Sequence, residues 1–210
     1  MKSTTLALTA ATLLASAGTA FAQNTQQNFV GPAIGLTVSA VQNKVDFEST
    51  VPSINGQNTQ TNDTEAALIA SYGFAMSPDW VGTVGISYSV KSMDAGKVNY
   101  TAGTAQSFSG TFKDHLAISF APGYRVGPNA LVYGKLAFHQ VKAEYTDTAA
   151  AGGTNTHTGT GIGLGVAFAL SPKVELRTEY EMVNFSSEKA NLTTGKPKMS
   201  GLTVGLLYKF

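Results

Sequence analysis

The last eight residues of the chain, Thr203-Val204-Gly205-Leu206-Leu207-Tyr208-Lys209-Phe210, are the part of the sequence that best indicates its fold. Leu206, Tyr208 and Phe210 share one face with Val204, and small or polar residues occupy the other face, with Leu207 as the one exception. This two-residue period is that of a strand between an apolar and a polar environment. An alternating strand that ends on an aromatic carboxy-terminal residue predicts the closing strand of a membrane β-barrel.

The same segment resembles the carboxy-terminal assembly signal of bacterial outer-membrane proteins. That signal has a polar residue, a glycine two places on, and aromatic residues at the third-last and last positions. Thr203, Gly205, Tyr208 and Phe210 occupy these positions. In that family the outer-membrane assembly machinery reads the segment during insertion. The resemblance therefore implies delivery to the outer membrane of a Gram-negative bacterium, with this machinery as a transient partner.

The amino terminus has the pattern of a secretory signal peptide. Lys2 precedes an uncharged run, and Ala20-Phe21-Ala22 supplies the small-x-small end that signal peptidases cleave. Cleavage after Ala22 would divide the chain into a signal peptide, residues 1–22, and one outer-membrane β-barrel domain, residues 23–210.

Composition excludes several classes of protein. The formal net charge is +1 and only 13% of the residues are charged, so the chain lacks the basic surface that releases phosphate counterions, and no nucleic acid partner is expected. There is no cysteine, which rules out disulfides and thiolate metal sites. The mature region has no apolar run of the roughly 18 residues that a transmembrane helix needs. No cofactor or metal is expected, because the three histidines lack metal-ligand spacing.

Eight segments of the mature chain alternate between apolar and polar residues. They lie at about 29–40, 65–74, 80–91, 113–124, 132–139, 159–168, 175–182 and 201–210. Short turns with Pro or Gly alternate with four polar stretches, at about 44–63, 92–111, 145–158 and 183–197, which we predict to be long loops. The sequence therefore predicts an all-β fold, an eight-stranded antiparallel up-and-down transmembrane β-barrel preceded by a cleavable signal peptide.

Alternation alone does not say which face is outside, since a soluble lipocalin-like barrel would place its apolar face inward. The positions of the aromatic residues indicate that the apolar face points outward. Phe74, Trp80, Tyr124 and Phe168 lie on the apolar face near short turns, where one membrane interface would fall. With an even number of strands, both termini would be periplasmic and the four loops extracellular.

The polar face carries charges that a transmembrane barrel would enclose. We expect a lumen network of ion pairs formed by Glu65, Lys91, Lys113, Lys135, Arg177, Glu179 and Glu181, with His115 and His139 also pointing inward. The glycine-rich segment at 159–165 leaves room for Lys135 to meet Glu179 or Glu181. Buried charges must be paired, so a structural plug is the first interpretation and a narrow ion path the second.

Nearly all of the mature chain resembles the small eight-stranded outer-membrane barrels, the family of the OmpA transmembrane domain, the OmpX/Ail type and the neisserial opacity proteins. That resemblance implies a structural or adhesin-like role at the cell surface, in lipid and lipopolysaccharide, with host or other extracellular ligands bound by the loops. A monomer is expected. The alternatives are a narrow porin-like channel for ions or small solutes and an outer-membrane lipid-modifying enzyme. The enzyme is disfavoured, because none of the three histidines begins the His-x-Ser motif that lipid A deacylases use.

Overall fold

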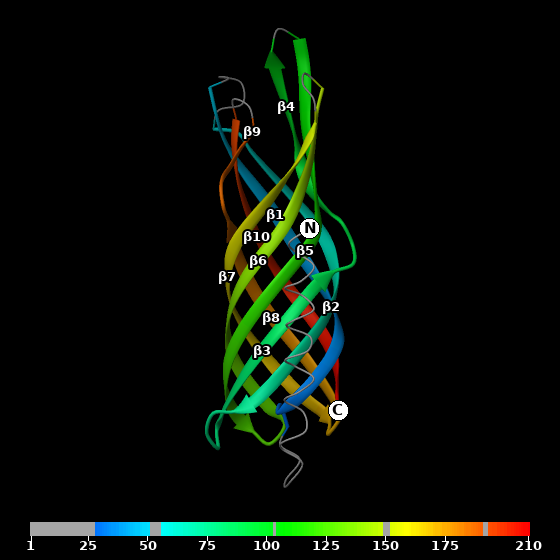
Figure 1. Cartoon of the computed structure of the whole chain (residues 1–210), viewed down its shortest axis with the longest axis vertical. Coiled ribbons are helices and arrows are strands. Elements are labelled where there is room, and N and C mark those ends of the chain that lie inside the picture. Colours follow the sequence, from blue (N-terminus) through cyan, green and yellow to red (C-terminus); the bar gives the residue numbers. More distant parts are fainter. Residues whose placement is uncertain (1–27, 51–55, 103, 149–151, 191–192) are drawn as a thin grey trace, which may run out of the picture.

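The computed structural model describes residues 28–50, 56–102, 104–148, 152–190 and 193–210, which form one closed antiparallel sheet (Figure 1). The strands are β1 (Gly31–Ser49), β2 (Asn58–Ala75), β3 (Trp80–Ser89), β4 (Met93–Ala102), β5 (Thr104–Gly127), β6 (Ala130–Asp147), β7 (Gly153–Ser171), β8 (Val174–Phe185), β9 (Glu188–Ala190) and β10 (Thr193–Lys209). The predicted signal peptide lies outside the described residues.

Eight of these strands form the wall of the barrel. They follow the order β1-β2-β3-β5-β6-β7-β8-β10, and β10 pairs back onto β1. The short strands β4 and β9 lie off the ring, paired with β5 and β10. Closure leaves the ring without a free edge, so its backbone groups bond within the sheet, as lipid requires. The prediction of an eight-stranded up-and-down barrel is confirmed.

The outer face of the barrel is apolar. Large hydrophobic side chains that alternate along the strands are exposed there, among them Ile34, Leu36, Val38, Leu68, Ile118, Phe120, Leu136, Phe138, Ile162, Leu164, Leu202, Val204 and Leu206. An exterior of this kind suits lipid rather than water, which decides against a lipocalin-like arrangement. Within the described residues, no helix has the length and apolarity needed to cross a membrane.

The four predicted loops are largely strand, so this part of the prediction is wrong. Spanning strands need about 9–11 residues, whereas β1 has 19 residues, β2 has 18, β5 has 24 and β7 has 19. The strands therefore continue past the apolar exterior as hairpins, which Figure 1 shows rising above the barrel at the end opposite the short turns.

The polarity of the two faces is reversed in these extensions. On β1 the apolar side chains of Leu36 and Val38 point outward, while further along the same strand the outward residue is Lys44 and the buried ones are Val45 and Phe47. The direction in which each side chain points has not changed. What changes is the surroundings, because the exterior passes from lipid to water and the interior must then supply the apolar core.

The predicted interfacial aromatics lie at the end with the short turns. Trp80 and Tyr124 are cross-strand partners with ring centroids 5.5 Å apart, and both are partly exposed. Phe168 is exposed near the turn into β8. Phe74 is half-buried, because the neighbouring Gly82 has no side chain and the Phe74 ring occupies that space.

Candidate functional site

A layer of ion pairs crosses the middle of the lumen. Lys135 Nζ on β6 donates to Glu179 Oε1 at 2.5 Å and to Glu181 Oε2 at 3.0 Å, both on β8. The three side chains are 13–15% exposed. In register, Gly163 of β7 lies between Lys135 and Glu181. Because glycine has no side chain, the lysine can cross that strand and reach the carboxylates.

A second charged group lies nearer the short turns. Arg177 Nε donates to Glu175 Oε1 on its own strand at 2.5 Å, and Glu175 is almost completely buried. Lys209 of β10 is buried as well. The predicted inward face of β8 therefore carries three glutamates and one arginine, and each of them pairs with an opposite charge in the lumen.

Two histidines extend the ion layer across the barrel. His115 Nδ1 is 2.7 Å from Glu65 Oε1, His115 Nε2 is 2.9 Å from His139 Nδ1, and His139 Nε2 is 3.2 Å from Glu181 Oε1. The sequence places both histidines inward but gives no sign that they touch, since they belong to different strands. Contact follows from the register of β5 and β6, in which Ala117 lies opposite His139.

Lys113 does not belong to this network, which corrects the prediction. A β-bulge interrupts the pairing of β5 with β6 between Lys113 and Leu116, and Asp114 adopts a φ of 49°. One extra residue in a strand reverses the face of the sheet to which every earlier side chain of that strand points. Phe112 is therefore buried in the lumen, and Lys113 points outward to a salt bridge with Glu144.

Lys91 is also outside the lumen. β3 ends at Ser89, so the alternation that placed Lys91 inward no longer applies two residues later. Its Nζ donates to Asp63 Oδ1 at 2.9 Å and to Thr64 O at 2.8 Å, at the end of the barrel that carries the long hairpins. The hydrogen bond from Lys91 lowers the pKa of Asp63 to about 2, so this carboxylate stays charged at any ordinary pH.

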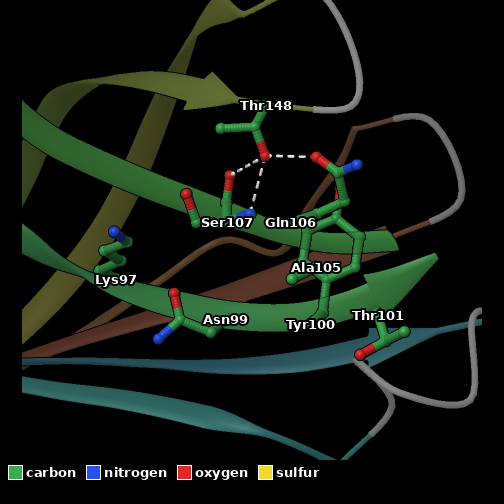
Figure 2. Close-up of a pocket in the computed structure, with 8 residues that line it drawn as sticks. All are labelled: Lys97, Asn99, Tyr100, Thr101, Ala105, Gln106, Ser107 and Thr148. Carbon is green, nitrogen blue, oxygen red and sulfur yellow. Dashed lines mark hydrogen bonds between the residues drawn. The ribbon is translucent and has the colours of Figure 1, made fainter. Parts of the chain in front are cut away.

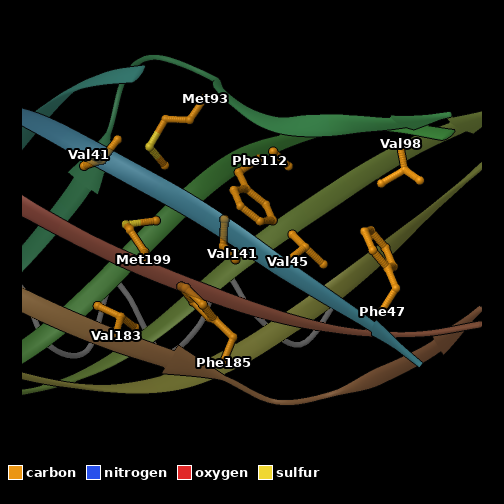
Figure 3. Close-up of a cluster of buried hydrophobic side chains, with 11 residues drawn as sticks. Val41, Val45, Phe47, Met93, Val98, Phe112, Val141, Val183, Phe185 and Met199 are labelled. Atoms are coloured by element: carbon orange, nitrogen blue, oxygen red, sulfur yellow. The ribbon is translucent and has the colours of Figure 1, made fainter. Parts of the chain in front are cut away.

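An apolar layer fills the barrel above the ion layer (Figure 3). Its buried members are Val41, Val45, Phe47, Met93, Ala95, Val98, Phe112, Val141, Val183, Phe185 and Met199. Phe112 and Phe185 form its aromatic floor, stacked with ring centroids 6.4 Å apart. The sequence pattern did not predict this layer, because most of its members lie in segments with the composition of loops or on the strand whose phase the Asp114 bulge reverses.

Buried side chains also occupy the other end of the lumen. Phe29, just before β1, is buried against Val81, Leu131 and Tyr133, in a left-handed conformation with a φ of 70°. Such a φ is unfavourable for a bulky residue and needs support from its surroundings. Arg125 provides it, since the guanidinium lies 5.8 Å from the Phe29 ring centroid and Nη1 donates to Asn28 O at 2.9 Å.

The predicted assembly-signal residues divide between the two faces of β10. Thr203 and Gly205 point into the lumen, where the Thr203 hydroxyl lies 2.7 Å from that of Ser39. Tyr208 and Phe210 point outward with their rings 5.4 Å apart, and Phe210 is 70% exposed. The aromatic part of the segment is therefore available on the outside of the barrel wall.

A polar pocket of about 440 Å³ lies at the tip of the β4–β5 hairpin (Figure 2). It is lined by Lys97, Asn99, Tyr100, Thr101, Ala105, Gln106, Ser107 and Thr148. The Thr148 hydroxyl donates to Gln106 Oε1 at 2.6 Å and accepts from the Ser107 amide at 2.8 Å. A hydrogen bond to Asp147 raises the pKa of Tyr100 to about 12, so this phenol stays protonated. Among the described residues, no cluster of His, Asp and Glu could hold a metal ion.

A closed antiparallel ring with an apolar exterior and charged groups inside it is the architecture of a transmembrane β-barrel. Residues 7–210 match the outer membrane protein β-barrel domain family, and the chain belongs to that family. No curated protein sequence matches the chain.

Solved structures give the same fold at low identity. Ail, the attachment invasion locus protein of Yersinia pestis, crystallised in complex with the heparin analogue sucrose octasulfate, is 16% identical with a TM-score of 0.50, covering 86% of this chain and 100% of that one. Neisserial surface protein A is 16% identical, with a TM-score of 0.45 and coverages of 85% and 99%. The outer membrane protease OmpT of Escherichia coli is 9% identical, with a TM-score of 0.47 and coverages of 90% and 99%. Identities this low relate folds, not functions.

Proposed function

We propose that this protein is a non-enzymatic surface-interaction barrel whose lumen is closed at neutral pH and whose extended hairpins bind an extracellular partner. The filled lumen carries this proposal. The barrel holds side chains at three successive levels: the cluster around Phe29, the ion layer of Lys135, and the apolar layer that contains Phe112. The two apolar levels are buried, and the side chains of the ion layer are 13–15% exposed. A barrel of eight strands is just wide enough for side chains to fill it.

An enzymatic role has little support, because the acidic residues of the lumen are already engaged. Glu179 and Glu181 both accept hydrogen bonds from Lys135, and Glu175 accepts one from Arg177. A general acid and base pair needs a substrate within hydrogen-bond reach. Buried apolar side chains lie on both sides of the ion layer, which disfavours the entry of a substrate.

The surface beyond the membrane supports recognition of an uncharged polar ligand, such as a carbohydrate. Apart from the ammonium of Lys97, the pocket is lined mostly by amide and hydroxyl groups such as those of Asn99, Gln106 and Thr148, which both donate and accept hydrogen bonds. Most extracellular lysines are paired with carboxylates: Lys44 with Asp46, Lys91 with Asp63, Lys113 with Glu144, Lys142 with Asp114, Lys196 with Glu48 and Lys198 with Asp46. A polyanion of the kind bound to Ail would have to compete with these carboxylates.

Two measurements on the purified, refolded barrel test this function. In planar bilayers at neutral pH we expect no stable conductance steps, and on an array of bacterial and host glycans we expect binding that Asn99→Ala weakens. Thr156→Ala, an exposed polar residue on the neighbouring hairpin, serves as the control and should bind normally. Stable conductance at neutral pH would instead support a narrow channel, and equal binding by both variants would exclude the pocket.

The route to the membrane is part of the same proposal. Residues 1–22 would be removed on export, leaving residues 23–210 as a monomer in the lipid and lipopolysaccharide of the outer membrane with both termini periplasmic. Outward-facing Tyr208 and Phe210 support a role for the carboxy-terminal segment in recognition by the assembly machinery.

Deleting Phe210 should lower the amount of protein that reaches the cell surface much more than it lowers the stability of the folded barrel. The side chain is 70% exposed, so little packing is lost with it. Surface labelling of intact cells measures delivery, and urea unfolding of the refolded protein measures stability. A deletion variant with normal surface levels would contradict the assembly role.

A further inference from the structure

Around the His115–His139 pair, four groups are connected by hydrogen bonds from wall to wall of the barrel. Glu65 on β2 bonds to His115, the two rings bond to each other, and His139 bonds to Glu181 on β8. The ring centroids are 5.1 Å apart and the ring planes are inclined by only 21°, so the rings meet edge to edge along this hydrogen bond. The two histidine side chains are 8% and 3% exposed, so water contributes little to satisfying their nitrogens.

Counting hydrogens fixes the protonation of the pair. A carboxylate only accepts, so His115 Nδ1 and His139 Nε2 must each carry a hydrogen. The contact between His115 Nε2 and His139 Nδ1 needs one hydrogen and has no room for two at 2.9 Å. Three hydrogens on four ring nitrogens mean that one ring is an imidazolium and the other is neutral.

The charges around the pair favour further protonation. Glu65 faces His115 from β2, Glu181 and Glu179 face His139 from β8, and Lys135 of β6 is the fixed cation that bonds to the last two. The other strands at this level contribute uncharged residues. They are Gly161 on β7, Ser89 on β3, Ser39 on β1 and Thr203 on β10. The three carboxylates outnumber the one lysine, so the surrounding charge favours protonation, whereas the contact between the rings has room for only one proton.

Separation of the rings would disturb the apolar layer above. A side chain added to Gly161 would meet His139 Nε2 at 2.6 Å, so His139 already fills the space on that side. Phe185 lies edge-on to both rings, with centroids at 6.4 Å from His115 and 6.3 Å from His139. Phe185 also stacks on Phe112. Any movement of the pair is therefore passed to the aromatic floor of the apolar layer.

We propose that the His115–His139 pair is a proton-controlled latch of the lumen. With one shared proton the rings bond to each other and the lumen stays closed. A second proton, bound on acidification, places two N–H groups against each other, breaks the ring-to-ring hydrogen bond and displaces Phe185.

Conductance tests the consequence of the latch. In planar bilayers with potassium chloride, we expect the unsubstituted protein to be silent at about pH 7.5 and to show current steps on acidification to about pH 5. His139→Gln keeps a hydrogen-bonding side chain but cannot take the proton, so the acid response should be lost. His157→Gln is the matched control, because His157 is buried elsewhere and bonds to Ser186 O. An acid response that His139→Gln retains, or none in the unsubstituted protein, overturns the latch.

Nuclear magnetic resonance of the ¹⁵N-histidine-labelled barrel tests the proton count itself and needs no variant. At neutral pH we expect three protonated nitrogens on the two rings and a coupling across the hydrogen bond between His115 and His139. On acidification the fourth proton appears and the coupling is lost. Two or four protonated nitrogens at neutral pH contradict the shared proton. Current at neutral pH would refute the closed-lumen function and leave this proton count standing.

Discussion

Lys135→Met should lower the free energy of unfolding by about 3–5 kcal/mol, the usual cost of removing one partner from a buried ion pair. Two carboxylates, Glu179 and Glu181, lose their shared cation while remaining 13–15% exposed. The loss will be smaller if water enters the lumen. We also expect noisier or higher conductance at neutral pH, since repulsion between the carboxylates opens the layer. Urea titration of the refolded barrel and single-channel recording measure the two effects.

A double-mutant cycle separates this pairing from a general loss of packing. Adding Glu179→Gln to Lys135→Met should recover part of the stability, because it removes one of the two carboxylates that the loss of Lys135 leaves unpaired. Lys142→Met is the matched control on the same strand. Its ammonium pairs with Asp114 in an exposed position, and its loss should leave stability unchanged. Independent effects of the two lumen substitutions would show that the ion layer is solvated and that its charges do not act together.

Phe112→Ala should cost a similar amount, about 3–5 kcal/mol, which is typical for truncating a buried aromatic side chain. Phe112 is 1% exposed and stacks on Phe185, so its removal leaves a cavity in the apolar layer. Loss of this ring also removes half of the aromatic floor beside the histidine pair. Stability in urea tests the packing, and conductance at neutral pH tests whether the layer closes the lumen.

Phe138→Ala provides the comparison for Phe112→Ala. Phe138 lies on β6 and points into the lipid, where it is 52% exposed. Lipid chains can fill the space that this truncation leaves, so the loss of stability should be smaller and the conductance unchanged. Equal losses for the two variants would mean that Phe112 contributes apolar area only and does not seal the barrel.

Much of the fold could be predicted from local pattern. The alternation of Leu202, Val204, Leu206 and Tyr208 placed these residues on one face, and the structure exposes all four on the outside of the wall. The inward positions of Lys135, Glu179 and Glu181 followed from the same period. This prediction succeeds because successive side chains of a strand must point to opposite faces, whatever the rest of the chain does.

Three features depended on longer-range structure. The bulge at Asp114 reversed the phase of β5, so Lys113 went outward and Phe112 inward. Beyond the lipid the apolar face became the inner one, so Val45 and Phe47 lay in segments whose polar outward residues suggested loops. The His115–His139 contact arose from the register of two strands.

The sequence by itself determined that this protein is an eight-stranded barrel with apolar residues facing lipid and charged residues facing a lumen. Both follow from a period that is local to each strand. Only the tertiary structure decided which charges meet, where the lumen is apolar, and that His115 and His139 come into contact. Which side chains meet depends on register and bulges, and these are set by pairing between strands that the pattern of a single strand does not encode. Where the lumen is apolar depends on where the lipid around the barrel ends.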